Sequence, residues 1–368
     1  MDVMHNPVTR FLTSLQAGAD IPLRLQLWNG MHHDLGSQPR VTVNVPGPAA
    51  LRYFLPPSLD NLAEGYVNGH FDVDGLAADI VAAATGLAQV GVGVPGQGKL
   101  GRLFSPLSHD QAKDAHAIEH HYDVSNDFYR LWLDEAMVYS CAYFPTRTES
   151  LEQAQINKLD HILNKLMLKP CERVAQAGLG SQVEIRLQDY RDVSARDGQF
   201  DKITSIGMFE HVGLNHLEAY FGKINALLKD GGLVLNHGIT STDPDSGVTP
   251  LGAAGFIEKY VFPNGELPHI SLALKALQSG GLEALDVECL RRHYARTLAC
   301  WSENYEQHIE AIHALVSETT YRVWRIYLAG CAHAFEQNWV SLHQVLACKA
   351  GTCEALNPTP WSRAYMYA

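Results

Sequence analysis

A run of aromatic, hydroxyl and amide side chains at residues 120–129 is the clearest candidate for chemistry in this chain. A second aromatic run, at residues 139–144, follows shortly and also contains a cysteine. A helix that only fills space does not need this mixture, whereas ring faces attract cations and hydroxyl groups fix the orientation of a ligand. The two runs therefore predict an aromatic-lined pocket for a polar, partly cationic ligand.

Four polar side chains are candidates for catalysis: Cys141, Glu210, His237 and Tyr294. Glu210 stands four residues after an apolar run and His237 closes another, and strand ends are where α/β enzymes place their reactive groups. Each residue also has an ordinary structural interpretation, such as a satisfied histidine, a small packing cysteine or a glutamate that caps a turn. The spacing alone leaves both interpretations open.

Three histidines, His116, His120 and His121, have a spacing that could hold zinc, because positions i and i+4 share one face of a helix. The sequence places no cysteine or carboxylate convincingly as a further ligand. We therefore expect no metal site.

Short elements of both kinds are expected before residue 90. Alternating apolar and polar residues predict half-buried strands at 23–27 and 41–45, and helical spacing predicts helices at 60–66 and 74–85. Together they form a small α+β domain over residues 1–90.

A glycine-rich segment separates this domain from the rest of the chain. Five of the residues from 91 to 101 are glycine, which predicts a flexible linker that we place at 91–105. Residues 106–368 then form a second, larger domain.

Strands and helices alternate in the larger domain. We expect helices at 151–168, 216–228 and 321–335, and strands at 182–188, 200–206, 233–237, 282–289 and 340–348. This alternation implies a parallel, doubly wound sheet that binds its ligands at the carboxyl ends of the strands.

Composition limits the partners. Hydrophobic residues make up 46% of the chain and charged residues 18%, which is typical of a folded globular protein. The net charge of -12 excludes nucleic acid as an expected partner, and membrane contact would depend on apolar insertion or on a basic patch such as Lys99, Arg102 and Lys113. Seven scattered cysteines without a C-x-x-C pair predict reduced thiols and a cytoplasmic protein.

The order of several segments resembles the cyclopropane-fatty-acyl-phospholipid synthase family, which includes the cyclopropane fatty acid and mycolic acid cyclopropane synthases. Besides the two aromatic runs, the similar segments are 62–69, 187–191, 207–213, 259–265 and 297–301. These enzymes use S-adenosylmethionine to add a methylene bridge across a lipid double bond. The resemblance implies an α/β fold, with a Rossmann-like S-adenosylmethionine-dependent methyltransferase domain and a smaller N-terminal α+β domain.

The resemblance also implies a bicarbonate ion beside the substrate double bond. The residues that match its ligands are Cys141, Glu210, His237, Ile239 (through its backbone) and Tyr294. Attack of the alkene on the methyl group leaves a carbocation, and a base must then remove a methyl proton to close the ring. Bicarbonate would be this base. Ring faces that could stabilise the cation are those of Tyr122, Tyr139, Phe144 and Tyr260.

For the cofactor, the resemblance implies contacts from Tyr122, Ser125, Tyr139, Ser140, Gln188, Asp189 and Tyr190. Tyr139 and Ser140 would lie near the methionine end. Asp189 would lie near the adenine, whose exocyclic amine a carboxylate can accept from. Without the resemblance, Asp189 and Tyr190 read equally well as an ordinary exit from a strand.

A glycine-rich cofactor loop is absent from the printed sequence between about residues 170 and 175. Family members carry a strand and a G-x-G-x-G loop shortly after the stretch that Lys169 and Pro170 resemble, and the loop holds the cofactor at a helix N-terminus. Either the natural chain contains this segment and the printed sequence omits it, or the protein lacks it. We expect an omission, because losing a central strand would remove more than the about 5–15 kcal/mol that stabilises a domain.

The function that we expect is cyclopropanation of cis-unsaturated acyl chains of phospholipids. The enzyme would be a homodimer that associates peripherally with the inner face of the cytoplasmic membrane, and its N-terminal domain would engage lipid or a second subunit. Two alternatives remain: methyl transfer to unsaturated lipid without ring closure, and a non-catalytic lipid-binding paralogue that lost its cofactor loop.

Overall fold

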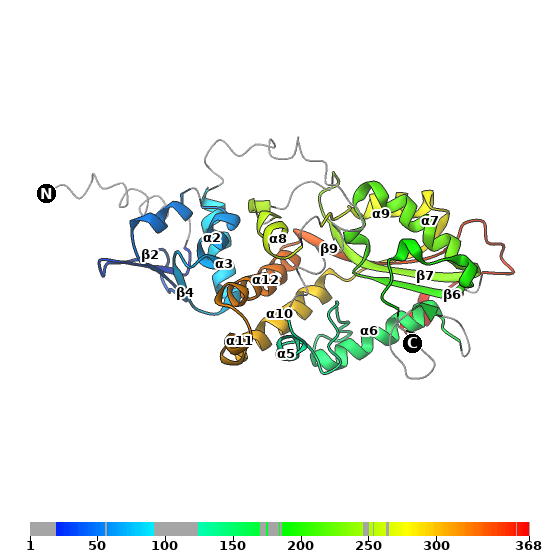
Figure 1. The fold of residues 1–368 in the computed structure, drawn as a ribbon, viewed down its shortest axis with the longest axis horizontal. Coiled ribbons are helices and arrows are strands. Elements are labelled where there is room, and N and C mark those ends of the chain that lie inside the picture. The colour runs from blue at the N-terminus through cyan, green and yellow to red at the C-terminus, as the bar shows by residue number, and fades with distance from the viewer. Residues whose placement is uncertain are drawn as a thin grey trace. The chain divides into compact units, whose positions relative to one another are not determined.

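The computed structural model describes residues 20–55, 57–91, 124–169, 174–175, 184, 186–245, 250–252, 254–262, 265–357 and 359–367 (Figure 1). Contacts divide the chain into two compact units. Unit 1 consists of Met1–Leu133, Val248–Pro263 and Leu298–Gln337, and unit 2 consists of Asp134–Gly247, Asn264–Thr297 and Asn338–Ala368. Because residues 92–105 lie outside the described residues, the division at this linker stays a prediction.

Within the described part of unit 1, four strands form a sheet in the order β2-β1-β3-β4. They are β1 (Leu23–Leu27), β2 (His32–Asp34), β3 (Val41–Val45) and β4 (Asp72–Asp74). Alternate residues of β1 and β3 are buried, as the period of two in the sequence predicts. Both predicted strands are confirmed.

Helices from distant parts of the sequence complete unit 1. They are α2 (Leu59–Val67), α3 (Ala77–Gly91), α5 (Asn126–Arg130), α8 (Ala254–Tyr260), α11 (Ile309–Leu315), α12 (Glu318–Glu336) and the second half of α10 (Arg291–Gln307). The helix predicted at 60–66 is confirmed as α2, and the one predicted at 321–335 lies within α12. The helix predicted from residue 74 begins later, at Ala77, because the chain is still extended in β4.

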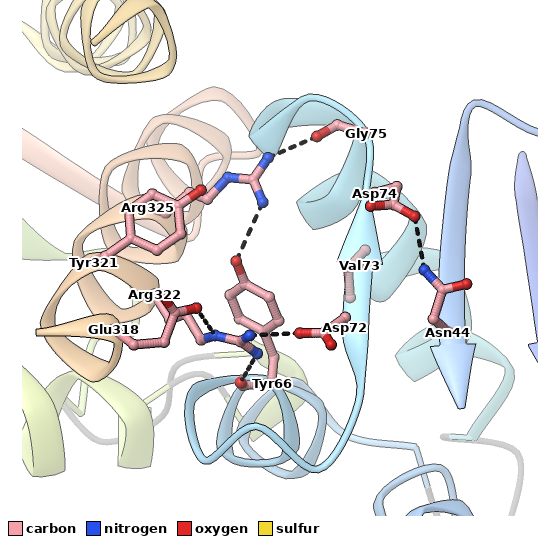
Figure 2. A pocket seen from close by; sticks show the side chains of 10 residues that line it. All are labelled: Asn44, Tyr66, Asp72, Val73, Asp74, Gly75, Glu318, Tyr321, Arg322 and Arg325. Atoms are coloured by element: carbon pink, nitrogen blue, oxygen red, sulfur yellow. Dashed lines mark hydrogen bonds and ion pairs between the residues drawn. The ribbon is translucent and has the colours of Figure 1, made fainter. Parts of the chain in front are cut away.

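A buried ion pair fixes α12 within unit 1. Arg325 donates to both carboxylate oxygens of Glu306, at 2.7 and 3.1 Å, and also to the Gly75 carbonyl and the Tyr66 hydroxyl. The bonds from Arg325 to Tyr66 and Gly75 join residues that line a cavity of about 650 Å³, in which Arg322 contacts Asp72 and Tyr66 (Figure 2). The arginines of this cavity therefore have a structural role, since they connect α12 to α2 and β4.

In the described part of unit 2, five strands form a sheet in the order β5-β6-β7-β9-β8. They are β5 (Val174–Ala175), β6 (Phe200–Ile206), β7 (Leu228–Ser241), β8 (Leu282–Cys289) and β9 (Val340–Lys349). Strands β5, β6 and β7 run parallel, whereas β9 pairs antiparallel with both β7 and β8. Four predicted strands are thus confirmed, and the sheet is parallel in its first half only.

Helices cover both faces of this sheet. On one face, α7 (Leu217–Leu227) and α9 (Ile270–Ser279) pack against Val234, and on the other, α6 (Leu151–Leu166) packs against Leu233 and Leu235 (Figure 1). Consecutive residues of β7 therefore belong to opposite cores, as expected for a central strand buried on both faces. The predicted helices at 151–168 and 216–228 are confirmed, and α6 ends early because Met167 adopts a left-handed conformation.

The strand predicted at 182–188 is wrong where the structure describes it. Glu184 and residues 186–189 have no strand conformation, and the side chain of Leu187 is fully exposed. The edge of β6 is occupied by the two-residue strand β5, which pairs through Val174 and Lys202, and the described residues of 182–188 pair with no strand. An alternating segment with no neighbouring strand cannot bury its apolar face. Residues 170–173, where the cofactor loop is missing, lie outside the described residues.

Candidate active site

The five residues predicted to act in catalysis all belong to unit 2. They lie on four elements: Cys141 in the loop before α6, Glu210 in the 3₁₀ helix Phe209–His211, His237 and Ile239 on β7, and Tyr294 in the first turns of α10. The side chains of Cys141, Glu210, His237 and Tyr294 are 0%, 6%, 2% and 9% exposed. All four are therefore shielded from water, which strengthens electrostatic interactions among them.

Backbone contacts connect these residues in space. The Glu210 carboxylate accepts from the Ile239 amide at 2.6 Å, and Ile239 is paired with Leu342 of β9. The Leu342 carbonyl in turn accepts from the amide of Leu290, whose own carbonyl accepts from the Tyr294 amide and the Cys141 thiol. The structure thus groups the predicted residues at one end of the sheet.

The position of Glu210 follows from the end of β6. Its last pair with β7 joins Ile206 to His237, so the next β7 amide on that edge, at Ile239, has no strand to bond. Glu210 Oε1 accepts a hydrogen bond from this amide, while Oε2 is buried without a hydrogen-bond partner in the described structure. Burial raises the pKa of the Glu210 carboxyl to about 7, and the bond from Ile239 opposes the increase.

Gly238 makes the close approach of Glu210 possible. A Cβ atom at this position would overlap the ring of Phe209 and lie 3.0 Å from Glu210 Oε1. We expect Gly238→Ala to lower the free energy of unfolding by about 1–3 kcal/mol, because it overpacks a buried contact. Gly222→Ala is the matched control: Gly222 lies in α7 with no atom within 4 Å of an added Cβ, so alanine there should stabilise by about 0.5–1 kcal/mol. Urea denaturation measures both, and equal effects would contradict the packing around Gly238.

The buried carboxyl group also predicts a pH dependence of stability. Because the folded-state pKa of Glu210 is raised from 4.5 to about 7, its contribution to stability is full below pH 4.5 and is lost as the pH rises through 7. Glu210→Gln cannot ionise. Between pH 5 and pH 8 the wild-type protein should therefore lose roughly 2 kcal/mol more than this variant in urea denaturation. Parallel losses would show that the carboxyl is not buried.

His237 contacts β9 through one ring nitrogen only. Its Nδ1 atom lies 3.2 Å from Gln344 Nε2, and its Nε2 atom is buried with no partner among the described residues. Burial lowers the pKa of His237 to about 3, with further contributions from the positive charges of Lys158 and Lys165. The ring is therefore neutral at physiological pH.

Hydrogen bonds to two other elements hold Cys141 and Ser140: the thiol contacts Leu290 and the hydroxyl contacts Lys158 of α6. Burial raises the pKa of the Cys141 thiol, so it remains protonated and donates to the carbonyls of Ala142 and Leu290. Lys158 of α6 donates to the Ser140 hydroxyl at 3.1 Å, and burial lowers the pKa of Lys158 to about 8. The loop that carries the second aromatic run is thus fixed against α6.

Only part of the first aromatic run can be placed. Tyr122 lies outside the described residues, as do His116, His120 and His121. Ser125 belongs to unit 1, where its hydroxyl caps α5 by accepting from the Phe128 amide. Phe128 and Tyr129 pack in an aromatic core with Trp132 and Trp324, so these two rings fill space within unit 1.

The predicted adenine contacts have partners of their own. The Asp189 carboxylate forms an ion pair with Arg191 at 2.7 Å and caps a short 3₁₀ helix, and this hydrogen bond from Arg191 lowers the pKa of Asp189. Tyr190 packs edge-on against Tyr220 with ring centroids 5.4 Å apart, and Gln188 is exposed. Their cofactor role stays a prediction.

A largely buried polar network beside His237 was not predicted from the sequence. It consists of His161, Lys165, Glu288 and Gln344, joined by hydrogen bonds of 2.5 to 2.8 Å. Its signal was present in α6, where Gln155, Lys158, His161 and Lys165 recur at helical spacing on the buried face.

Two further properties concern the described residues only. They contain no group of three or more His, Cys, Asp or Glu side chains arranged to hold a metal ion. Nor do the helices described here include one that is long and apolar enough to span a bilayer.

Comparisons with known proteins identify the class. The crystal structure of mycolic acid cyclopropane synthase CmaA1 complexed with SAH and CTAB superposes with a TM-score of 0.57 and 29% identity, over 64% of this chain and 98% of that one. The fold is that of S-adenosylmethionine-dependent methyltransferases. A probable fatty acid methyltransferase of Pseudomonas putida is 40% identical over 94% of this chain and 96% of its own length. Cyclopropane mycolic acid synthase 1 of Mycobacterium tuberculosis is 31% identical over 62% of this chain and 94% of its own.

Family models identify the family. A model described as mycolic acid cyclopropane synthetase matches residues 109–180 and 171–345, and a domain of unknown function (DUF7884) matches residues 11–90. The chain therefore belongs to the mycolic acid cyclopropane synthetase family, and the predicted resemblance is confirmed.

The same comparisons bear on the missing loop. The family model matches in two pieces that meet at residues 171–180, where the glycine-rich loop is missing from the printed sequence. The alignment with the Pseudomonas putida relative extends over 394 positions, which is more than the 368 residues of this chain. That relative therefore has residues that this sequence lacks.

Proposed function

We propose that this protein transfers a methylene group from S-adenosylmethionine to the cis double bond of unsaturated phospholipid acyl chains and forms a cyclopropane ring. The observation that carries the proposal is two buried polar atoms without partners in the described structure, Glu210 Oε2 in the 3₁₀ helix after β6 and His237 Nε2 on β7, four residues before that strand ends. Buried polar atoms are nearly always satisfied, so each of these two atoms is open to a hydrogen bond from a ligand.

The reaction needs a dry site with one proton acceptor. An alkene is a weak nucleophile, so it must be held in line with the sulfonium methyl group away from water. The carbocation that follows must lose a proton, and a group with a pKa near the working pH accepts it best. In the proposal bicarbonate is this acceptor, and Glu210, whose pKa burial raises to about 7, orients it.

Bicarbonate fits the two unpartnered atoms. His237 can donate to an anion oxygen through Nε2, and Glu210 can accept from an O–H group through Oε2. When bound there, bicarbonate supplies the base beside the double bond. Because the Ile239 amide already bonds Glu210 Oε1, its part in this structure is to orient the carboxylate. Cys141 and Tyr294 complete the proposed set; the Cys141 thiol and the Tyr294 backbone amide both donate to the Leu290 carbonyl.

The cofactor contacts in the proposal are those predicted from the resemblance. Of these, Ser140 is held in place by Lys158, and the neighbouring Tyr139 is half-buried. The fit to the cofactor is partial, because the glycine-rich loop is missing from the printed sequence. The partner is an unsaturated phospholipid, reached by peripheral association with the inner face of the cytoplasmic membrane, and the N-terminal residues would engage lipid or a second copy of the chain in a homodimer.

Methyl transfer without ring closure is the rival reaction. It is favoured by the name of the 40% identical relative, a probable fatty acid methyltransferase. Both reactions begin with the same attack on the methyl group and differ in which proton leaves. An acceptor positioned by Glu210 and His237 favours ring closure, because it can take a proton from the new methyl group.

A non-catalytic lipid-binding protein is the other alternative, and the missing loop favours it. Isothermal titration of the full natural chain with S-adenosylmethionine separates the two classes. The enzyme requires saturable binding, whereas a scaffold that lost the loop shows none.

The reaction itself is tested with purified protein, S-adenosylmethionine labelled in its methyl group, and vesicles of phospholipid with cis-monounsaturated chains. We expect label in the acyl chains. Vesicles of the saturated phospholipid with the same headgroup are the control and should remain unlabelled. Label in the headgroup, or equal labelling of both lipids, would rule out the proposed substrate.

A further inference from the structure

A continuous chain of hydrogen bonds, buried at Gln344 and Lys165 and partly buried at Glu288, extends from His237 within unit 2. Gln344 stands directly opposite His237 on β9, with its Nε2 atom 3.2 Å from His237 Nδ1. Lys165 of α6 donates to Gln344 Oε1 at 2.8 Å and to Glu288 at 2.5 Å, and His161 lies 2.7 Å from the same Glu288 oxygen. Gln344 and Lys165 are both completely buried.

The lysine fixes which way the glutamine amide points. The two ends of an amide are ordinarily hard to tell apart, but an ammonium group has only donors, so the Gln344 atom that faces Lys165 must be the carbonyl oxygen. The amide NH₂ group then faces His237 Nδ1. Because an NH₂ group can only donate, Nδ1 must accept, and the neutral ring carries its proton on Nε2.

The tautomer matters because of where Nε2 lies. This atom is buried and has no hydrogen-bond partner in the part of the chain that the structure describes. An unsatisfied buried donor costs about 1–3 kcal/mol, so an arrangement that creates one is expected only where a ligand accepts from it. The opposite tautomer would present a lone pair, which repels an anion.

We propose that Lys165 and Gln344 are positioning residues that hold His237 as an Nε2–H donor toward an anionic ligand. Glu288 neutralises the charge of Lys165 and, together with His161, holds it in place from the other side. The tautomer follows from the hydrogen bonds alone; only the identity of the anion rests on the proposed function.

The tautomer is measured directly by ¹⁵N NMR of histidine-labelled full-length protein. We expect the wild-type His237 signals to be those of the Nε2–H form. Gln344→Glu keeps the shape of the side chain and its contact with Lys165 but replaces the donor by an acceptor, so His237 should switch to the Nδ1–H form. Gln153→Glu on the exposed face of α6 is the matched control and should leave the signals unchanged.

Two results would overturn the proposal: an Nδ1–H tautomer in the wild-type protein, or signals that Gln344→Glu does not change. The wild-type spectrum decides the first point even if the variant does not fold. In the lipid assay, Gln344→Glu should lower kcat by about 100-fold, as expected for the loss of an oriented donor, and should change the lipid KM much less. If the wild-type protein transfers no methyl group, the proposed function fails while the NMR result still decides the tautomer.

Discussion

Glu210→Gln should lower the rate of methyl incorporation into unsaturated lipid by at least about 100-fold, the usual contribution of a positioned general base or its orienting group. The amide keeps the size of the side chain and an oxygen that can accept from the Ile239 amide. It loses the ionisable group whose pKa burial raises to about 7, and it places a donor where the buried Oε2 acceptor was. Initial rates with labelled S-adenosylmethionine and cis-unsaturated vesicles measure the effect.

Glu218→Gln is the matched control for this change. Glu218 lies on the exposed side of α7 in the same unit, so its replacement should leave the rate within about twofold of wild type. Titration with S-adenosylmethionine separates a loss of chemistry from a loss of cofactor binding. A Glu210→Gln protein that retained half of the wild-type rate would exclude Glu210 from the reaction.

Arg325→Met should destabilise unit 1 by about 3–5 kcal/mol, because it removes one partner of a buried ion pair. Arg325 is only 8% exposed and bonds Glu306. It also bonds the Tyr66 hydroxyl and the Gly75 carbonyl, as Figure 2 shows. Methionine fills much of the volume, but the Glu306 carboxylate, whose side chain is 13% exposed, loses its counter-charge. Urea denaturation measures the change in the free energy of unfolding.

A surface arginine of the same unit provides the comparison. Arg130 pairs with Asp127 at the surface, where the two side chains are 59% and 72% exposed, so Arg130→Met should cost less than about 1 kcal/mol. Combining Arg325→Met with Glu306→Leu should recover part of the lost stability, since no unpaired charge then remains. Equal effects of Arg325→Met and Arg130→Met would contradict the buried network.

Local sequence patterns correctly predicted those strands that have a partner strand in the folded sheet. The strands at 200–206 and 282–289 coincide with β6 and β8, because an apolar run between turns specifies a buried strand wherever a partner strand is present. The predicted strand at 182–188 alternates apolar and polar residues but pairs with no described strand, and it is not a strand where the structure describes it. Pairing is a property of the whole sheet, which no local window contains.

Sequence patterns likewise predicted some residues of the candidate site and not others. Glu210 and His237 could be suspected from their places after apolar runs, whereas Ile239 came only from the family resemblance. Composition alone could not tell whether the aromatic residues at 120–129 line a pocket or pack in a core. Phe128 and Tyr129 pack in the core of unit 1. Lys165 and Gln344 meet from positions far apart in the chain, so their contact could not be predicted from spacing.

S-adenosylmethionine with a trideuterated methyl group gives the most direct test of ring closure at Glu210 and His237. Purified full-length protein is incubated with this cofactor and cis-unsaturated vesicles, and the acyl chains are analysed by mass spectrometry and deuterium NMR. Proton removal from the new methyl group predicts a three-membered ring that retains two of the three deuterons. An acyl chain that keeps all three deuterons as a methyl branch, or two as a methylene branch joined by a double bond, would contradict ring closure.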